Sequence, residues 1–332
     1  MKFSLIVCTY QRPKALIELL NSVLKQTLYP NELIIVDGSL DCATKDELEK
    51  NNYKNLRYYK VEETDRGLTK QRNYGISKVS NESEVICFLD DDTILDSFYF
   101  ENLIKTYHTN MDAIGVGGYI ANEVIWTKAN NMKCGNEYFC FGGYRRKEAT
   151  RFKIRKFFGL DSNVSPGFMP NYSHGRPISY LPPSNKTYKV EFFMGGIASF
   201  KKSIFNKLEF STYFKGYGLY EDLDFCLRVS QKGQLYVNTA AKLEHHHAQE
   251  GRPNSYAYGK MVLRNGWYVW RVKYPTPNLK AQFKWHTIAL LLTLIRLSNV
   301  LTTKQPKQAF TESLGRMVGW LSLIMNKPIH KT

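Results

Sequence analysis

The sequence of 332 residues predicts an α/β fold with a mostly parallel sheet, flanking helices and a C-terminal helical extension. Three observations predict it. The chain opens with a β-α-β pattern, apolar strands alternate with helical stretches to about residue 125, and longer apolar helical stretches follow residue 251. A chain of this length holds one large α/β domain with an appendage, or two domains.

Alternating strands and helices fill the first part of the chain in order. The predicted strands span 4–8, 32–36, 56–61 and 85–89, and the predicted helices span 14–26 and a stretch that opens at Gly67. Pro13 suits the first turn of the first helix. Because β-α-β units make parallel sheets whose strand ends share one rim, we expect Thr9, Asp37 and Asp90 to lie on the same rim.

Three consecutive carboxylates, Asp90-Asp91-Asp92, end the apolar run 85–89. Carboxylates do not continue a buried strand, so we expect the chain to leave the sheet at Asp90. Three adjacent negative charges repel one another unless a cation lies among them, and a hard divalent cation with oxygen ligands fits. The alternative is a helix N-cap at Asp92 or Thr93, with a helix directly after it. The triplet alone leaves both interpretations open.

The composition points to an anionic partner, because the formal charge is +16. Nucleic acid, a membrane surface and phosphorylated small molecules would all match that charge. The sequence has no RNA-binding signature and no zinc finger, so a nucleic-acid partner is not expected. The six cysteines contain no CxxC pair, so neither a disulfide framework nor a zinc ribbon is expected, and a reducing cytoplasm fits.

The middle of the chain has less regular patterns. A glycine-rich strand is predicted at 113–120, and the region 122–189 predicts long loops that are either a functional lid or a solvated basic surface. Strand character returns at 190–200, and a helix is expected from Glu221. Short strands at 234–237 and 241–244 lead to three histidines, of which His245 and His247 would share one face of an extended chain.

Four segments together resemble the family-2 glycosyltransferases of the GT-A fold. They are Val7-Cys8-Thr9-Tyr10-Gln11-Arg12-Pro13, Ile35-Val36-Asp37-Gly38-Ser39, Gly67 through Ile76, and Phe88-Leu89-Asp90-Asp91-Asp92. The pair Glu221-Asp222, after a Gly-aromatic-Gly lead-in, resembles the family's catalytic region. The resemblance implies a metal-dependent, inverting enzyme that transfers a sugar from a nucleotide-diphosphate donor to a hydroxyl of a glycan or lipid-linked acceptor in polysaccharide synthesis.

The resemblance also implies residue roles. Asp222 would be the general base, with Glu221 orienting it or contacting the acceptor. Mn²⁺ or Mg²⁺ would bind the Asp-X-Asp motif through Asp92, supported by Asp90 and His245, with His247 as the second choice of histidine. The residues expected to bind the nucleotide are Thr9, Tyr10, Arg12, Asp37, Gly67, Arg72, Asp90 and Asp91.

Within that nucleotide set, Arg12 and Arg72 are candidates for phosphate contact. Asp37 would accept the N–H of a uracil or thymine ring, which favours a UDP- or dTDP-linked donor. Asp91 would face the donor or be structural. Gly195 and Gly196 would lie near the donor sugar and the acceptor.

The predicted domains are a donor-binding half at 1–125, an acceptor-binding and catalytic half at 126–250, and a helical, aromatic and basic extension at 251–332. Apolar stretches at 285–301 and 317–325, flanked by cations, predict interfacial helices on the cytoplasmic face of an anionic membrane. Helices packed on the catalytic domain are the alternative.

Two other classes of function remain open. A nucleotidyltransferase can share such a sheet, but it lacks an explanation for Glu221-Asp222, and the turn after the first strand has no glycine-rich phosphate loop. A non-catalytic basic protein that binds membranes or nucleic acid leaves the acidic motifs without a role.

Overall fold

A computed structural model describes residues 1–129, 134–247 and 253–328, and the chain divides into two compact units. Unit 1 comprises Met1–Trp126 and Pro177–Gly251, and unit 2 comprises Thr127–Arg176 and Arg252–Thr332. This division differs from the predicted domains. The segment 127–176 clusters with the C-terminal helices rather than with the rest of 126–250.

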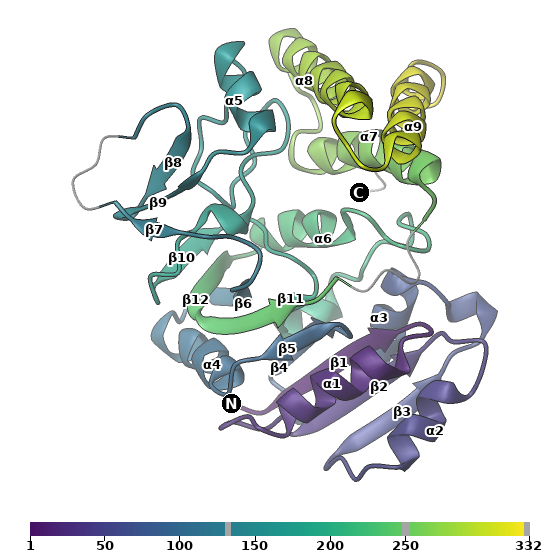
Figure 1. The fold of residues 1–332 in the computed structure, drawn as a ribbon. Helices are drawn as coiled ribbons and strands as arrows, with labels where there is room; N and C mark the ends of the chain where they lie inside the picture. Colours follow the sequence, from purple (N-terminus) through teal and green to yellow (C-terminus); the bar gives the residue numbers. More distant parts are fainter. Residues whose placement is uncertain (130–133, 248–252, 329–332) are drawn as a thin grey trace. The chain divides into compact units, whose positions relative to one another are not determined.

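Unit 1 is built on a nine-stranded sheet whose strands follow the order β10-β12-β6-β11-β4-β1-β2-β3, with β5 paired to β12 (Figure 1). The sheet is mostly parallel, as predicted, because β1 to β4, β6 and β12 point in one direction. The strands are β1 (Phe3–Thr9), β2 (Glu32–Asp37), β3 (Leu56–Lys60), β4 (Val85–Asp90), β5 (Thr93–Leu95), β6 (Ala113–Ile120), β10 (Thr187–Val190), β11 (Ile197–Lys201) and β12 (Gln234–His245).

Helices flank this sheet. They are α1 (Pro13–Val23), α2 (Ala43–Glu49), α3 (Leu68–Ser77), α4 (Tyr99–Thr109) and α6 (Glu221–Ser230), with short 3₁₀ turns at Glu63–Asp65, Ile178–Tyr180 and Lys202–Asn206. The helix predicted at 14–26 is α1, in which Leu16, Leu19, Leu20 and Val23 are buried, whereas Leu24 lies just beyond it and is exposed. The central strands β2 and β4 are buried over almost their whole length, as expected for strands covered on both faces.

Three predicted elements of unit 1 were wrong in detail. The residues after Asp92 form the strand β5, which pairs with β12, and the next helix begins only at Tyr99, so the helix N-cap interpretation of the Asp triplet fails. The strand predicted at 190–200 is interrupted, because Val190 ends β10 and β11 begins only at Ile197. The two short strands predicted before the histidines form one continuous strand, β12, with an irregularity between Val237 and Lys242.

Unit 2 contains a small sheet of order β7-β9-β8 and four helices. Its elements are β7 (Thr127–Lys128), β8 (Tyr138–Phe141), β9 (Tyr144–Lys147), α5 (Thr150–Phe157), α7 (Ser255–Lys273), α8 (Leu279–Ser298) and α9 (Pro306–Met325), and a 3₁₀ turn at Asn299–Leu301. Cys134 and Cys140 form a disulfide with Cα atoms 6.1 Å apart. The expectation of no disulfide was therefore wrong for this pair, whereas the other four cysteines are free thiols.

Small residues allow α7 and α9 to pack closely. A side chain at Gly259 would overlap the Glu312 carbonyl, and one at Gly315 would overlap the Tyr256 carbonyl. The core beside them is aromatic, because Trp267 contacts both Trp270 and Trp285. These tryptophans are buried, so the aromatic residues expected at a membrane surface belong largely to the core of unit 2.

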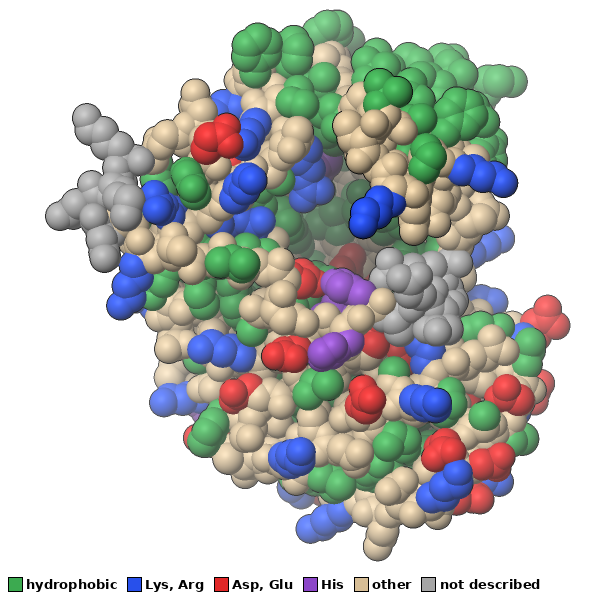
Figure 2. Space-filling model, in the orientation of Figure 1, with side chains coloured by type: hydrophobic (Ala, Val, Ile, Leu, Met, Phe, Trp, Pro, Cys, Tyr) green, Lys and Arg blue, Asp and Glu red, His purple; other side chains and the backbone are tan. Residues whose placement is uncertain are grey.

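On the outer surface of unit 2, hydrophobic side chains gather over α8 and α9 (Figure 2). Among the described residues, none of the helices combines the length and the apolar character needed to cross a bilayer.

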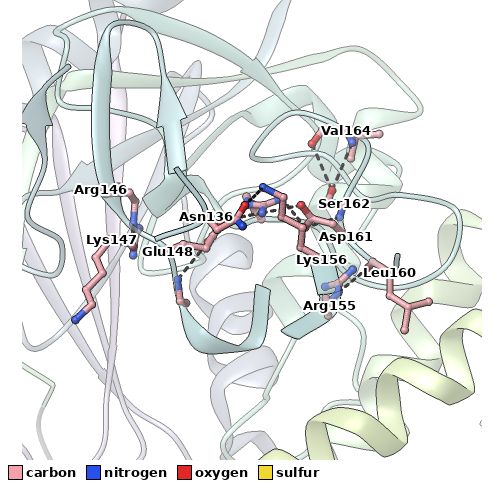
Figure 3. A network of polar contacts seen from close by, with 12 residues as sticks. Asn136, Arg146, Lys147, Glu148, Arg155, Lys156, Leu160, Asp161, Ser162 and Val164 are labelled. Carbon is pink, nitrogen blue, oxygen red and sulfur yellow. Dashed lines mark hydrogen bonds and ion pairs between the residues drawn. The ribbon is translucent and has the colours of Figure 1, made fainter. Parts of the chain in front are cut away.

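Part of the basic cluster at 145–156 is structural. The buried Arg155 donates from Nε to the Leu160 carbonyl at 3.0 Å and belongs to the network of polar contacts in Figure 3. Arg176 pairs with Glu148 at 2.8 Å and with Asp161 at 2.9 Å. A buried arginine held by carboxylates and carbonyls fixes the loops of this segment, so neither a simple solvated surface nor a wholly mobile lid describes it.

Candidate active site

The ends of β1, β2 and β4 lie on one rim, as their sequence pattern predicted. Thr9 is in register with Asp37, and Cys8 is in register with Asp90. A cavity of about 500 Å³ opens at this rim. Its lining residues are Cys8, Thr9, Tyr10, Arg12, Glu63, Arg66, Gly67, Leu68, Gln71, Asp90, Asp91, Gly216 and Tyr217. The edge beyond the carboxyl ends of strands is where open α/β sheets bind ligands.

Within the triplet, Asp91 contacts β1 and the turn that follows it. Asp91 is buried and accepts hydrogen bonds from the Thr9 hydroxyl at 2.7 Å and from Arg12 Nη1 at 3.1 Å. Burial raises the pKa of Asp91 to about 6, while Arg12 and Thr9 oppose that rise. Of the two roles expected for Asp91, these contacts support the structural one, because its oxygens tie β4 to the turn after β1.

Asp90, Asp92 and His245 offer ligand atoms within 4.8 Å of one another. The strand β12 brings the histidine there, since His245 pairs with Thr93 in β5, and the His246 N–H bonds to the Asp92 carbonyl at 2.9 Å. Two carboxylates and an imidazole form a mixed oxygen and nitrogen set that suits Mn²⁺ and also accepts Mg²⁺. The donor chemistry of this group therefore fits the predicted cation.

Each ring nitrogen of His245 faces a carboxylate. Its Nε2 lies 3.1 Å from Asp92 Oδ1, and its Nδ1 lies 3.6 Å from Glu123 Oε1. Burial alone would lower the pKa of His245, but Asp92 and Glu123 outweigh it and raise the pKa to about 10. A histidine must be neutral to bind a metal, so cation binding at this group has to release the imidazolium proton.

His247 belongs to a second group. Its Nε2 lies 3.0 Å from Glu123 Oε1, and its backbone has a left-handed φ of 51°. Glu123, His245 and His247 also offer ligand atoms within 4.8 Å of one another. Of the two histidines considered, only His245 is grouped with the Asp triplet, which supports the first choice. No sequence signal marked Glu123, because it follows β6 in an irregular segment.

Gly196 leaves room for Asp90, and its substitution gives a direct test of the cation group. A Cβ at Gly196 would overlap the carboxylate of Asp90, which can move because it is the end of a side chain. The backbone contact, in which the Asp90 N–H donates to the Gly196 carbonyl at 3.2 Å, does not involve the Cβ position. We expect Gly196→Ala to fold and to weaken Mn²⁺ binding about tenfold or more, because the carboxylate must move. Binding of Mn²⁺ is measured by electron paramagnetic resonance, with Gly135→Ala as the matched control, since nothing lies within 4 Å of that Cβ. Unchanged Mn²⁺ affinity in Gly196→Ala would contradict a ligand role for Asp90.

Arg72 lies inside the protein instead of at a phosphate position. It is only 2% exposed, pairs with Glu221 and lies 3.5 Å from Asp90. Its guanidinium also stacks over the Phe210 ring at 5.2 Å. These contacts favour a structural role for Arg72 over the expected contact with phosphate. Arg72 joins the Asp triplet to the helix that carries Glu221. Arg12, in contrast, lines the cavity while it holds Asp91.

The helix α3 fastens the segment before α6. Thr69 donates to the Phe214 carbonyl at 3.1 Å, and Asn73 exchanges hydrogen bonds with Phe210 at 2.8 and 2.9 Å. Thr69 and Arg72 on this helix are buried. These contacts place Glu221 and Asp222, at the start of α6, beside the rim.

Glu221 and Asp222 have different surroundings. Glu221 is buried against Arg72, and burial raises its pKa to about 8, although Arg72 opposes this. Asp222 is partly exposed and accepts the N–H of Gly195 at 3.1 Å and that of Leu223 at 2.7 Å. Burial raises the pKa of Asp222 as well, and these two N–H groups oppose the rise. Asp222 is therefore the better placed of the two to meet a substrate.

Gly195 lies between these groups, because a Cβ there would overlap both Arg72 and Glu221. Gly195 and Gly196 thus serve close packing against the acidic groups. Their expected proximity to a sugar stays a prediction.

The predicted nucleotide residues separate into two sets. Thr9, Tyr10 and Gly67 line the cavity, and Gly67 has a φ of 113° that favours glycine. Asp37 is fully buried, accepting the Tyr58 hydroxyl at 2.8 Å and the Ser39 N–H at 2.8 Å, and it does not line the cavity. Its contact with a pyrimidine ring stays a prediction.

Sequence reasoning gave no role to seven of the lining residues, among them Arg66, Gln71 and Tyr217. Arg66 and Gln71 lie in the segment from Asp65 to Ile76, where only Gly67 and Arg72 were given roles, and Tyr217 is the aromatic residue of the Gly-aromatic-Gly lead-in. Gln71 donates to the Thr9 carbonyl at 3.1 Å and to the Val36 carbonyl at 2.9 Å, so it holds two strand ends at the cavity. For Gln71 and Tyr217 the available signal was their position within a recognised segment, and Arg66 directly precedes such a segment.

Comparisons with known proteins agree with this arrangement. The chain is 31% identical over 131 residues to a glucosyl-dolichyl phosphate glucuronosyltransferase of Haloferax volcanii, covering 39% of this chain and 41% of the relative. It is 36% identical over 128 residues to a poly(ribitol-phosphate) β-N-acetylglucosaminyltransferase of Staphylococcus aureus, covering 36% of this chain and 21% of the relative. The aligned parts thus span less than half of either relative.

Among solved structures, GalNAc-T7 with UDP, GalNAc and Mn²⁺ matches with a TM-score of 0.51 at 16% identity, covering 79% of this chain and 47% of that one. This likeness shows a shared fold, which is the GT-A fold expected from the sequence. The sequence profile described as "Glycosyl transferase family 2" matches residues 4–209, which include the Asp triplet and both glycines of the site. The chain belongs to glycosyl transferase family 2.

Proposed function

We propose that this protein is an inverting, divalent-cation-dependent glycosyltransferase that moves a sugar from a pyrimidine nucleotide-diphosphate donor to a hydroxyl of a glycan or lipid-linked acceptor in cell-surface polysaccharide synthesis. One observation carries the proposal. Asp90, Asp92 and His245 offer carboxylate and imidazole ligand atoms within 4.8 Å of one another, at the rim where the cavity opens.

The residues of the rim meet the two demands of sugar transfer. When bound at Asp90, Asp92 and His245, a divalent cation supplies Lewis-acid stabilisation to the negative charge of the departing diphosphate. Asp222 takes the proton of the acceptor hydroxyl as its oxygen bonds to the anomeric carbon and the bond from that carbon to the diphosphate breaks. A single displacement of this kind inverts the anomeric centre.

The cavity supports a nucleotide donor. Tyr10 and Tyr217 provide aromatic surface, and Arg12 and Arg66 provide positive charge, at its wall. The structural neighbour GalNAc-T7 was solved with UDP and Mn²⁺, which makes these the first ligands to test. The acceptors named for the relatives, a dolichyl phosphate sugar and poly(ribitol-phosphate), support a lipid-linked or polymeric acceptor.

A thermal-shift panel of UDP-, dTDP- and GDP-sugars, each with and without Mn²⁺, tests the donor and the cation together. We expect stabilisation by the uridine or thymidine class that requires Mn²⁺. Release of the nucleoside diphosphate from the same donor then reports turnover. Stabilisation by GDP-sugars alone, or equal stabilisation without a cation, would contradict the proposal.

The dependence of transfer on pH gives a second test. Asp222 acts as a base only when ionised, and burial raises its pKa. We therefore expect kcat/KM to fall as the pH decreases, with a midpoint above the ordinary aspartate pKa of about 3.9. An acid limb at or below that value, measured with saturating Mn²⁺, would contradict the assignment.

The place of action is part of the proposal. We place the enzyme at the cytoplasmic face of an anionic cell membrane because of its positive charge. We expect no nucleic-acid partner, because the sequence has neither an RNA-binding signature nor a zinc finger. Fractionation of cells that express the full chain, followed by detection in cytosolic and membrane fractions, tests this placement.

A further inference from the structure

The helix α8 exposes an apolar stripe along its whole length. Exposed apolar residues recur at helical spacing, from Phe283 in the second turn of the helix, which is 73% exposed, to Leu301 in the 3₁₀ turn after it, which is 89% exposed. The stripe consists of Phe283, Leu290, Leu294, Leu297 and Leu301, the last just beyond the helix. A helix on the surface of a soluble domain normally directs polar side chains outward, so this stripe marks an interaction surface.

The helix α9 repeats the pattern. Its exposed large side chains are Phe310, Leu314, Leu321, Ile324 and Met325. The two helices pack against each other within unit 2, and Figure 2 shows hydrophobic side chains gathered over both. We call these ten residues the α8–α9 face. Single exposed apolar residues are ordinary, but two full-length stripes on contacting helices are not.

Unit 2, which carries this face, is strongly basic. Unit 2 contains 23 Lys and Arg against 4 Asp and Glu, a formal charge of +19, while unit 1 contains 23 against 26, a formal charge of −3. Within 252–332 the only acidic residue is Glu312, which binds Arg296 at 2.7 Å and Arg316 at 2.6 Å. Exposed lysines on and between the two helices include Lys280, Lys304 and Lys307.

The positive charge of unit 2 indicates which kind of partner can bind the α8–α9 face. A second copy of the chain would bring the same excess of positive charge to the interface, and like charges repel in a low-dielectric contact. The partner must therefore be apolar where it meets the two stripes and negatively charged where it meets the lysines. The acyl and headgroup boundary of an anionic bilayer has that composition.

We propose that the α8–α9 face docks on an anionic lipid bilayer, with the two apolar stripes at the acyl boundary and the lysines at the headgroups. The proposal extends the proposed function by naming the surface that holds the enzyme near a lipid-linked acceptor. It does not depend on turnover, because binding is measured without donor or acceptor.

Co-sedimentation of the full chain with vesicles tests the proposal. Vesicles of equal parts phosphatidylglycerol and phosphatidylcholine are compared with vesicles of phosphatidylcholine alone, at low and high salt. We expect the wild type to sediment with the anionic vesicles, and high salt to weaken this binding. The Asp222→Asn variant should bind vesicles like the wild type, so loss of catalysis and loss of docking are distinguishable.

Substitutions on the face sharpen the test. Leu294→Gln and Leu321→Gln should each weaken vesicle binding roughly tenfold while leaving the unfolding temperature unchanged, because both side chains are exposed. The matched control is Met111→Gln, an exposed apolar residue of unit 1, which should bind like the wild type. Lys304→Gln with Lys307→Gln should reduce the preference for phosphatidylglycerol.

Three outcomes would overturn the proposal. They are equal binding of both vesicle types, wild-type binding by the two leucine variants, and a wild-type dimer that the leucine variants convert to monomer in light scattering. The last outcome would assign the α8–α9 face to self-association instead.

Discussion

The Asp222→Asn variant is expected to transfer sugar about 10²–10⁴-fold more slowly than the wild type, which is the range that removal of a general base produces. Asn has the size of Asp, and its carbonyl oxygen can still accept one of the two N–H groups, from Gly195 and Leu223, that hold this side chain. The fold and donor binding should therefore persist. The measurement is kcat for transfer at saturating donor and Mn²⁺, together with the UDP-dependent thermal shift.

The matched control for this variant is Glu209→Gln, which removes an exposed carboxylate from the segment before α6 without touching the rim. It should transfer sugar at the wild-type rate. If Asp222→Asn keeps a rate within threefold of the wild type while Glu221→Gln loses it, the base is Glu221 and the assignment is wrong. The structure argues against that result, because Glu221 is buried and paired with Arg72.

The rim was predictable from the sequence because its geometry follows from local pattern. Once β1, β2 and β4 are recognised as buried parallel strands, their ends must meet, and Thr9, Asp37 and Asp90 follow without knowledge of the rest of the fold. The same reasoning placed His245 at the end of β12. Its grouping with Asp92 needed the pairing of β12 with β5, a strand that the sequence pattern had suggested as a helix.

Other features depend on contacts between distant parts of the chain. Arg72 looked like a phosphate ligand because its partner Glu221 lies 149 residues further along. The hydrogen bond that Tyr58 donates to Asp37 likewise joins two different strands. Local periodicity carries no information on which side chains will meet across such separations, so the polar interior of the site could not be derived from it.

The grouping of 127–176 with the C-terminal helices has the same origin. The segment has short strands and one helix of eight residues, too little regular structure to show a sequence period. Its place in unit 2 is decided by tertiary contacts such as those between α5 and α8. The charge division between the units was equally hidden, because unit 2 is formed from two separate stretches of the chain.

Removing the Asp92 carboxylate should strongly weaken the binding of the divalent cation that we propose. In Asp92→Asn the side chain keeps its shape and one oxygen, but it loses the charge that faces His245 Nε2 at 3.1 Å. We expect Mn²⁺ affinity, measured by electron paramagnetic resonance, to fall at least about a hundredfold and kcat/KM at fixed Mn²⁺ to fall with it. Excess Mn²⁺ should restore part of the activity of this variant, whereas a misfolded protein would not respond.

Two controls separate ligand loss from damage to the strand. Glu244→Gln removes the exposed carboxylate next to His245 in β12 and should leave Mn²⁺ affinity unchanged. Chelation should inactivate the wild type reversibly, with Mn²⁺ restoring the rate. A wild type that transfers sugar in the presence of chelator would refute the cation group. Wild-type Mn²⁺ affinity in Asp92→Asn, with loss in Glu123→Gln and His247→Ala, would instead assign the cation to the second group, because Glu123 and His247 share His245 with the first.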